Sequence, residues 1–401
     1  MSPFNLNSQA AGKTRGLTAS CRLQLSRHGL TTAVFAFALA GLSTMVLAGG
    51  PSSAGFSGSG NAAANANVAA GTNGPSVLLA AANASGDSKS AERNISDWLM
   101  RMHEASRNRA YLGVFVVSSA SSMASAKIWH VCDGDQQIER VETLTGAPRS
   151  TFRRNDEVIT FHPESKTALA EKRESMGLFP NLLKSQNSSI EQFYAARQTG
   201  VERVAGFEAD VVQLVPKDAL RFGYRVWSEK KSGLVVKLQT LDTDGKVLEQ
   251  AAFSELQLDA NVSSAKLTQM MAATDGYKVE RPDLVKTTAL AEGWLLKTPV
   301  AGFKPMSCYK RVVVKGDGPQ AESAMQWIFS DGLASVSLFA EVFDRQRHLK
   351  EGLAGAGATQ SLTYRLTEKA ADKTTEWWLT AVGEVPAQTL TSFVQGLERK
   401  K

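Results

Sequence analysis

The two-residue periodicity that begins at Tyr111 constrains the fold of this chain more than any other feature of its sequence. Short runs of β-branched and aromatic residues follow one another from there, separated by turn-forming clusters such as DGD, RND and DTDG. Such runs predict antiparallel strands joined by tight turns. The runs are YLGVFVVSS, AKIWHVC, RSTFRR, VITFH, ADVVQLVP, FGYRVWSE, GLVVKLQTL and KVLEQAAFSEL. We therefore expect a meander of about eight or more strands.

Two helices are expected within the same unit. The segment NISDWLMRMHEASRN places Ile95, Trp98 and Met102 at helical spacing, and Asn94 precedes it as an N-cap candidate. The segment SIEQFYAARQ predicts a second helix over residues 190–198, which interrupts the strands. We expect these elements to form one large domain over residues 94–262.

A smaller unit is expected after the periodicity weakens near Leu258. We treat residues 263–292 as a linker and residues 293–401 as a second domain. Five strands are predicted, in the segments GWLLKTPVAGF, CYKRVVV, MQWIFSDGLASVSLFAEVF, QSLTYRL and EWWLTAVGEV. A final helix is predicted in PAQTLTSFVQGL, because Pro386 suits a first helical turn and Leu390, Phe393 and Val394 share one stripe. The predicted fold class is α+β, with two cores.

The N-terminal region has the pattern of an export signal. Four basic residues precede an uncharged run of 19 residues from Leu30 to Ala48, and the first acidic residue is Asp87. This layout predicts a signal peptide over residues 1–48, cleaved after Ala48, and an exported, soluble mature chain. A retained membrane anchor is the alternative, because the run approaches the length that spans a bilayer. Residues 49–93 predict a disordered tether, since 30 of the 38 residues from Gly49 to Gly86 are Ala, Gly, Ser or Asn.

The charge of the mature chain argues against a nucleic-acid partner. Cleavage takes away four of the 45 basic residues and none of the 39 acidic ones, so the net charge falls from +6 to +2. The remaining residues of both signs are interspersed, whereas a nucleic-acid-binding surface needs clustered Lys and Arg. We expect no nucleic acid to bind.

Two cysteines, Cys132 and Cys308, remain after cleavage. An oxidising compartment allows an even pair to form a disulfide. The required separation of the two Cα atoms cannot be read from a sequence. A Cys132–Cys308 disulfide and two partly buried thiols therefore both stay open.

The stretch FSDGLASVSLFAEVF, residues 329–343, raises the question of catalysis. Ser330 and Asp331 stand at a glycine-containing bend, and His348 follows. No G-x-S-x-G motif accompanies them, and Ser-Asp-Gly is common turn chemistry. Beyond the bend, alternate residues predict a strand with one apolar face, formed by Ala334, Val336, Leu338, Ala340 and Val342. We expect a turn and a strand, no catalytic residues and no enzymatic activity.

A metal site is weighed at His130 and Cys132, which lie two residues apart on a predicted strand, with Asp133 and Asp135 beyond. A structural zinc site needs four ligands at recognisable spacing, and the mature chain has no CxxC or HExxH motif. The segment DTDG at residues 242–245 resembles the start of a calcium loop, but the remaining ligands are missing after it. Both segments favour turns, and we expect no metal and no cofactor.

Aromatic residues on the predicted strands are the remaining candidates for a binding site. Strands that are apolar on both faces usually form core. The alternative is an incompletely closed sheet whose concave face accepts an acyl chain or an apolar segment of a partner. On that interpretation the lipid-binding candidates are Phe115, Trp129, Phe152, Phe161 and Trp227.

Six segments in order resemble the RseB/MucB family of periplasmic sigma-E regulators. They are DWLMRMHEASRNRAYLGVFV, KIWHVCDGDQQIERVETLTGAPRSTFRRNDEVITFHP, GYRVWSEKKSGLVVKLQTLDTDGKVLEQAAFSEL, GWLLKTPVAGF, FSDGLASVSLFAEVF and WWLTAVGEVPAQTL. The resemblance covers roughly residues 96–397, which is more specific than any single motif. The chain departs from the family in its tether, in Cys132 and Cys308, and in the segment MGLFPNLLKSQNSS.

The resemblance implies a large N-terminal domain similar to the lipoprotein carriers LolA and LolB, which is an unclosed antiparallel β-barrel with plugging helices. It also implies a small C-terminal α/β domain of antiparallel strands with a C-terminal helix. The implied partner is the periplasmic domain of an RseA/MucA-like anti-sigma factor, shielded from a site-1 protease of the DegS type. Lipopolysaccharide or another acylated ligand would release it, and self-association into a homo-oligomer is a further implication. The alternative function is a periplasmic lipid or lipoprotein carrier, against which the second domain argues.

Overall fold

The computed structural model describes residues 93–120, 122–134, 136–172, 189–282, 284–313, 322–370 and 373–400. It also describes two short parallel strands, β1 (Val34–Phe35) and β8 (Ser175–Met176). The predicted cleavage site after Ala48 and the tether up to residue 92 lie outside the described residues, as does most of the predicted signal peptide. The signal peptide and the tether therefore stay predictions.

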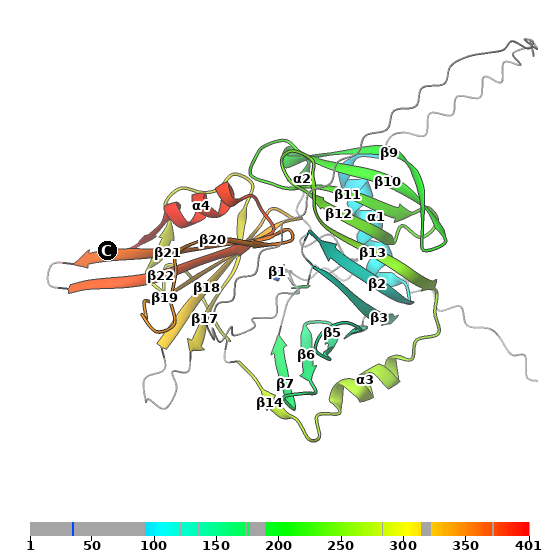
Figure 1. The fold of residues 1–401 in the computed structure, drawn as a ribbon, viewed down its shortest axis with the longest axis horizontal. Helices are drawn as coiled ribbons and strands as arrows, with labels where there is room; N and C mark the ends of the chain where they lie inside the picture. Colours follow the sequence, from blue (N-terminus) through cyan, green and yellow to red (C-terminus); the bar gives the residue numbers. More distant parts are fainter. Residues whose placement is uncertain are drawn as a thin grey trace, which may run out of the picture. The chain divides into compact units, whose positions relative to one another are not determined.

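The larger sheet contains 12 strands in the order β14-β7-β6-β5-β4-β3-β2-β13-β12-β11-β10-β9 (Figure 1). The last strand of the meander, β13, returns to pair with the first, β2, so that Leu258 lies opposite Tyr111. Strands β9 and β14 remain at the two edges, so the sheet is unclosed, as predicted. The strands are β2 (Tyr111–Ser119), β3 (Met123–Asp133), β4 (Gln136–Thr143), β5 (Ser150–Arg154), β6 (Glu157–His162), β7 (Thr167–Lys172), β9 (Tyr194–Val204), β10 (Phe207–Pro216), β11 (Gly223–Glu229), β12 (Val235–Leu241), β13 (Val247–Leu258) and β14 (Lys278–Glu280).

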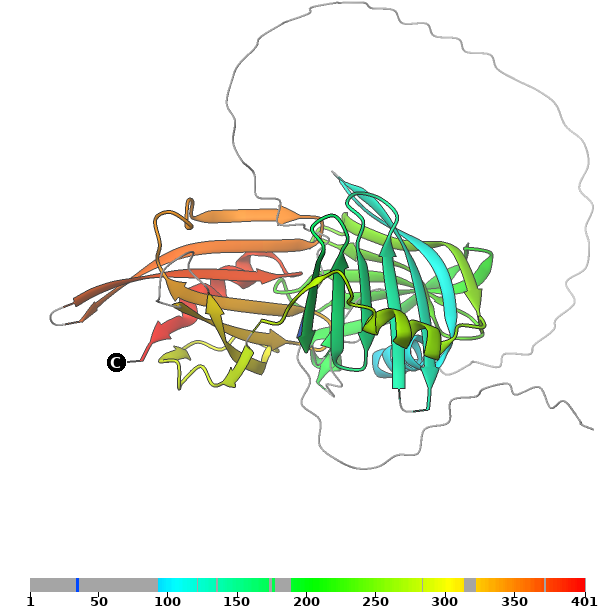
Figure 2. The ribbon, with the colours of Figure 1, turned by 90° about the horizontal axis from the view of Figure 1, so that it is seen from below.

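Two helices cover opposite faces of this sheet. Helix α1 (Ile95–Asn108) begins where predicted, because the side chain of Asn94 accepts a hydrogen bond from the amide of Asp97 at 2.8 Å. Helix α3 (Ser264–Ala272) is capped by Ser263 and lies across the strands β3 to β5 (Figure 2). Adjacent residues of a strand point to opposite faces. Ile128 joins the cluster of buried residues that includes Ala105 of α1, whereas Trp129 packs with residues of α3.

The helix predicted over residues 190–198 is wrong beyond Phe193. Helix α2 spans only Ile190–Phe193, and the chain continues as the edge strand β9. Residues from Tyr194 onward pair with β10, from Tyr194 opposite Pro216 to Val204 opposite Phe207. Pairing of the backbone with a formed neighbour strand overrides the local helical preference of the sequence.

The smaller sheet has seven antiparallel strands in the order β15-β17-β18-β19-β22-β21-β20. Helix α4 (Ala387–Gly396) packs on it with Leu390 and Phe393 fully buried against Val336 and Leu338, as predicted. Three strands of the small domain were not predicted, namely β15, β20 and β23, and neither were β4, β7 and β14 of the larger sheet. The elements are β15 (Leu284–Thr287), β16 (Trp294–Leu296), which pairs with β23 (Leu397–Arg399), β17 (Lys304–Val313), β18 (Glu322–Ser330), β19 (Ser335–Val342), β20 (Gly352–Ala356), β21 (Thr359–Ala370) and β22 (Lys373–Gly383).

The predicted linker over residues 263–292 contains α3, β14 and β15. The predicted one-sided packing of β19 is only partly correct. Ser335 and Ser337, on the opposite face from Val336, are buried as well, because β19 is a central strand of its sheet. Val342 is 37% exposed at the far end of the strand.

Candidate functional site

The Ser330–Ala334 turn between β18 and β19 is a closed hydrogen-bonded unit. One carboxylate oxygen of Asp331, Oδ1, accepts hydrogen bonds from the amides of Leu333 (2.9 Å) and Ala334 (2.7 Å). The hydroxyl of Ser330 donates to the carbonyl of Ala334 at 2.9 Å and accepts from the amide of Gly332 at 3.0 Å. Gly332 has a φ of 108°, which favours glycine. The prediction of a turn at this position is confirmed.

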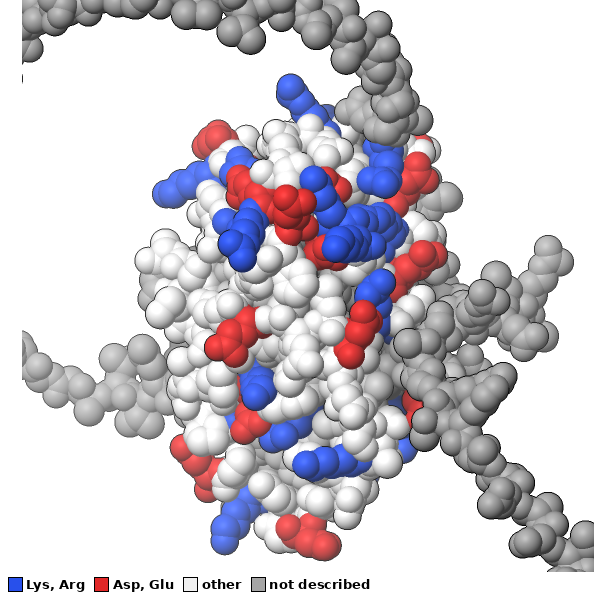
Figure 3. All heavy atoms as spheres, turned by 90° about the vertical axis from the view of Figure 1, so that its right-hand side faces the viewer, with Lys and Arg blue, Asp and Glu red and all other residues white. Residues whose placement is uncertain are grey.

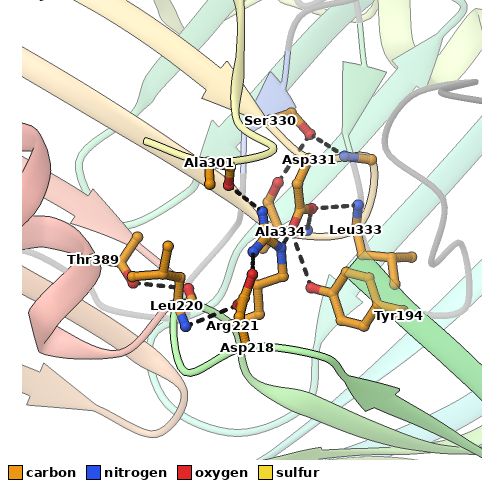
Figure 4. A network of polar contacts seen from close by, with 11 residues as sticks. Tyr194, Asp218, Leu220, Arg221, Ala301, Ser330, Asp331, Leu333, Ala334 and Thr389 are labelled. Atoms are coloured by element: carbon orange, nitrogen blue, oxygen red, sulfur yellow. Dashed lines mark hydrogen bonds and ion pairs between the residues drawn. The ribbon is translucent and has the colours of Figure 1, made fainter. Parts of the chain in front are cut away.

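The second oxygen of Asp331 receives an arginine from the large domain. Arg221 lies in the connection between β10 and β11, and its Nε donates to Oδ2 of Asp331 at 2.8 Å (Figure 4). The hydroxyl of Tyr194 donates to the same oxygen at 3.1 Å. The two remaining guanidinium nitrogens donate to the carboxylate of Asp218 and to the carbonyl of Ala301. Arg221 and Asp331 are both 0% exposed, so the ion pair is completely shielded from water.

Aromatic rings enclose the guanidinium of Arg221. Its Cζ lies 4.3 Å from the ring centroid of Phe193 and 5.0 Å from that of Phe303. Gly302 stands beside it with a φ of 81°, and a Cβ atom there would overlap the guanidinium. This conformation and this close approach both require glycine. The pocket for Arg221 is therefore built by both domains.

Around this ion pair, each domain also packs one leucine against the core of the other domain. Leu333 of the turn is buried in the core cluster that contains Trp98 of α1 and Tyr194. Leu220 packs in return against the core of the small domain. The carbonyl of Leu220 accepts a hydrogen bond from Thr389 of α4 at 2.8 Å (Figure 4). We call the group formed by Arg221, Asp331, Leu220 and Leu333 the junction.

Burial shifts the pKa values of Asp331 at the junction and of the neighbouring Tyr194. It raises the pKa of Asp331 above its ordinary value, although Arg221 and the amides of Leu333 and Ala334 act in the opposite direction. Burial and the nearby Asp331 raise the pKa of Tyr194 well above its ordinary value, so its hydroxyl stays protonated and donates. A buried charge of this kind is tolerated only with all of its partners in place.

The structure does not bring the catalytic candidates together. The hydroxyl of Ser330 and the carboxylate of Asp331 are both engaged within the turn and the junction. His348 instead stacks on Trp378, with ring centroids 4.8 Å apart, and its Nδ1 accepts from the amide of Asp344 at 2.9 Å. The arrangement at Ser330 therefore stabilises a fold and presents no nucleophile and base pair.

The metal candidates have structural partners. His130 is buried, stacks on Tyr111 at 4.7 Å and places Nδ1 3.3 Å from the carboxylate of Glu139. Burial would raise the pKa of Glu139, but Arg153 and His130 hold it below its ordinary value. The thiol of Cys132 donates to the carbonyl of Asn108 at 3.3 Å. In the part of the chain that the structure describes, no three His, Cys, Asp or Glu side chains converge on a metal site. Asp135 lies outside the described residues.

Cys132 and Cys308 are both in the thiol form in the structure. Cys308 lies on β17 within the core of the small domain. Burial, together with the nearby Glu292, raises the pKa of the Cys308 thiol to about 12.

The five lipid-binding candidates fall into two separate clusters. Phe115 and Trp227 belong to the cluster that contains Ala105 of α1. Phe152 and Phe161 pack edge to face at 5.7 Å, and Trp129 packs against their cluster. Met271 and Leu267 of α3 cover this second cluster. Lipid binding by these residues stays a prediction, and an acyl chain would have to enter beneath one of the two helices.

Charged residues of both signs alternate on the face of the molecule shown in Figure 3. Basic and acidic side chains there lie next to one another instead of gathering into a patch of one sign. The helices of the described segments include none with the length and apolarity needed to cross a membrane.

Two family models match the two halves of this fold. The MucB/RseB N-terminal domain matches residues 94–271, and the MucB/RseB C-terminal domain matches residues 288–398. The chain belongs to the MucB/RseB family. The first match ends within α3 and the second begins after β15, so Arg221 lies in the first matched domain and Asp331 lies in the second.

Relatives of known role support this assignment. The sigma factor AlgU regulatory protein MucB of Pseudomonas aeruginosa is 28% identical over 295 residues, which cover 73% of this chain and 87% of the relative. The sigma-E factor regulatory protein RseB of Escherichia coli K12 is 24% identical over 243 residues, covering 60% of this chain and 73% of the relative. A crystal structure of MucB in complex with MucA(peri) superposes with a TM-score of 0.58 at 25% identity, covering 76% of this chain and 99% of that one.

Arg221 is the site residue that sequence reasoning missed. It stands in the segment KDALRFG between two predicted strands, and a charged residue in such a connection is exposed on average. The one available signal was its position between Leu220 and Phe222, because an arginine flanked by large apolar residues in a short connection is a candidate for burial. Its partner Asp331 was identified as a turn residue, but the contact between them depends on two segments about 110 residues apart.

Proposed function

We propose that this protein is a periplasmic regulator that binds the periplasmic segment of a membrane anti-sigma factor and shields it from site-1 proteolysis. The observation that carries the proposal is the match of both domains to one regulatory family, joined by a completely buried ion pair. A structural relative was crystallised with MucA(peri), which supports an anti-sigma factor as the class of partner. The proposed role is steric and needs no catalytic residue.

Release of the partner is proposed to follow binding of an acylated ligand such as lipopolysaccharide. A ligand shifts a binding equilibrium only if it prefers one of the two states. The two apolar clusters beneath α1 and α3 are the places where acyl chains would bind, at the cost of displacing a helix. Helix α3 is short, and Met270 and Met271 are side chains that adapt to irregular ligands.

The proposal is tested by measuring binding of the chain without residues 1–48 to the purified periplasmic segment of the anti-sigma factor by calorimetry. A protection assay with a DegS-type protease follows, with and without lipopolysaccharide. We expect binding, slower cleavage of the segment, and restored cleavage when lipopolysaccharide is added. Absence of binding in both conditions would refute the regulator, and transfer of lipid between vesicles without partner binding would instead support the carrier.

A further inference from the structure

Four strands form the edges of the two large sheets, and β20 differs from the other three. An exposed edge can pair with another chain, and charged side chains, bulges and proline normally oppose this. Strand β9 carries Arg197, Glu202 and Arg203 and contains a register shift, β14 carries Lys278 and Glu280, and β15 carries Lys286. Strand β20 reads Gly-Leu-Ala-Gly-Ala and has no charge, no proline and no register shift.

All five residues of β20 are exposed. The strand pairs with β21 on one side, where Leu353 lies opposite Leu362 and Ala354 lies opposite Ser361. In the described segments, no strand pairs with its other side. The backbone amides and carbonyls that point away from β21 therefore form a ready template for one more strand.

This edge is held in place at both ends. The hydroxyl of Thr363 hydrogen-bonds to the carbonyls of Lys350 (3.1 Å) and Gly352 (3.3 Å). At the other end, the turn into β21 is buried at Ala358, whose amide lies 3.5 Å from the carboxylate of Glu249 in the large domain. An ordered edge loses little conformational entropy on pairing, which favours binding.

We propose that β20 is a strand-addition site for an extended segment of the anti-sigma factor's periplasmic part, which becomes the eighth strand of the small sheet. This inference rests on the function proposed above and names the surface used. The side chains at this edge indicate which residue types the partner segment should carry. Leu353, at 54% exposed, shares a face with Tyr364, at 45% exposed, so alternate residues of the segment should be apolar on that face. Its remaining residues should be small or uncharged.

A second copy of this chain is the weaker occupant. Only Leu353 among the five residues of β20 has a side chain larger than alanine, so two copies would bury little apolar surface between them. Stable interfaces need large, well-packed apolar anchors at their centre. A partner strand can supply such anchors over Leu353 and Tyr364, and a second β20 cannot.

The test combines hydrogen exchange with two substitutions of opposite charge. Ala354→Lys and Ala354→Glu each place a charge on the exposed edge, and Val201→Lys, at a 47% exposed position of the charged edge β9, is the matched control. We expect the purified periplasmic segment to protect amides of residues 352–356 from exchange. Both Ala354 variants should bind it about tenfold more weakly, and the Val201 variant should bind as the wild type does.

The possible outcomes separate this inference from the proposed function. If the wild type does not bind the segment, the function fails and the inference fails with it. If the wild type binds but residues 352–356 gain no protection and the Ala354 variants bind normally, only strand addition at β20 is refuted. Weakening by one charge but not the other would show simple charge complementarity and also refute it. Protection that appears on raising the protein concentration without the segment would assign the edge to self-pairing instead.

Discussion

Replacing Arg221 by methionine should uncouple the two domains. The substitution keeps an apolar stem between Phe193 and Phe303 but removes the donors to Asp331, Asp218 and Ala301. Asp331 then remains 0% exposed without its cation, held only by Tyr194 and two amides. Breaking a buried ion pair by removing one partner costs about 3–5 kcal/mol of unfolding free energy.

A double-mutant cycle isolates the contribution of the pair. Asp331→Asn keeps the oxygen that organises the turn, and Arg221 still has Asp218, so we expect a loss of about 1.5–3 kcal/mol, typical of a hydrogen bond to a charged group. The loss in the double variant should fall short of the sum by about 1–3 kcal/mol, since contacting residues couple. Arg154→Met is the control, because the pair Arg154–Glu157 is exposed and should contribute at most about 1 kcal/mol.

Urea unfolding followed by tryptophan fluorescence and by circular dichroism measures these values. If the junction couples the domains, the wild type unfolds in one transition and Arg221→Met separates the two probes into two transitions. Additive losses in the cycle, or an Arg221→Met variant within about 1 kcal/mol of the wild type and still unfolding in one step, would refute the reasoning. Such a result would mean that the ion pair does not connect the domains energetically.

Three further predictions concern single sites. Gly302→Ala should cost about 1–3 kcal/mol of unfolding free energy, because it forces a residue with a side chain into a left-handed conformation beside Arg221. Equal denaturation midpoints for the variant and the wild type would contradict this. Glu139→Gln should destabilise by about 1–3 kcal/mol at pH 7. The pKa of Glu139 is lowered in the fold, so its contribution is present above the unfolded pKa of about 4.3 and is lost as pH falls through the folded pKa. Unfolding curves of the variant and the wild type should therefore converge once the pH is below the folded pKa. Mass spectrometry after iodoacetamide treatment at pH 8 should show Cys308 unmodified in the native protein. After denaturation without reductant, both Cys308 and Cys132 should be modified, whereas a disulfide between them would block modification of both.

The strands and both cores could be predicted because their signals are local. Alternation located β2, β10 and β13 within a few residues, and helical spacing located α1 and α4. The errors arose where pairing partners decide the structure. Residues 194–198 favour a helix in isolation, but in the fold they pair with β10. Strand β20 consists of glycine, leucine and alanine, which have little strand propensity, and it forms a strand because it pairs with β21.

The junction was beyond sequence reasoning for a related reason. A single charged residue in a loop indicates a solvated position on average. Whether Arg221 is buried depends on the placement of the Ser330–Ala334 turn, of Ala301 and of Phe303, all in another domain. The turn itself was predicted from Ser-Asp-Gly, and within the turn only one of the two carboxylate oxygens of Asp331, Oδ1, accepts hydrogen bonds. The other oxygen carries the contact between the domains.

The packing of Leu333 also predicts how a lipid signal would reach the partner. Leu333 of the Ser330–Ala334 turn shares one core cluster with Trp98, Leu99 and Met102 of α1, so an acyl chain that displaces α1 also disturbs this turn. Leu333→Ala leaves a cavity there and should cost about 2–5 kcal/mol of unfolding free energy. It should also reduce the factor by which lipopolysaccharide weakens binding of the anti-sigma segment, because the cavity lets α1 move without moving the turn. Calorimetric titrations of the wild type, Leu333→Ala and the control Leu349→Ala, which is 84% exposed, measure that factor without lipopolysaccharide and with a saturating concentration. An unchanged factor in Leu333→Ala would show that the lipid acts on the partner by a route that bypasses the junction.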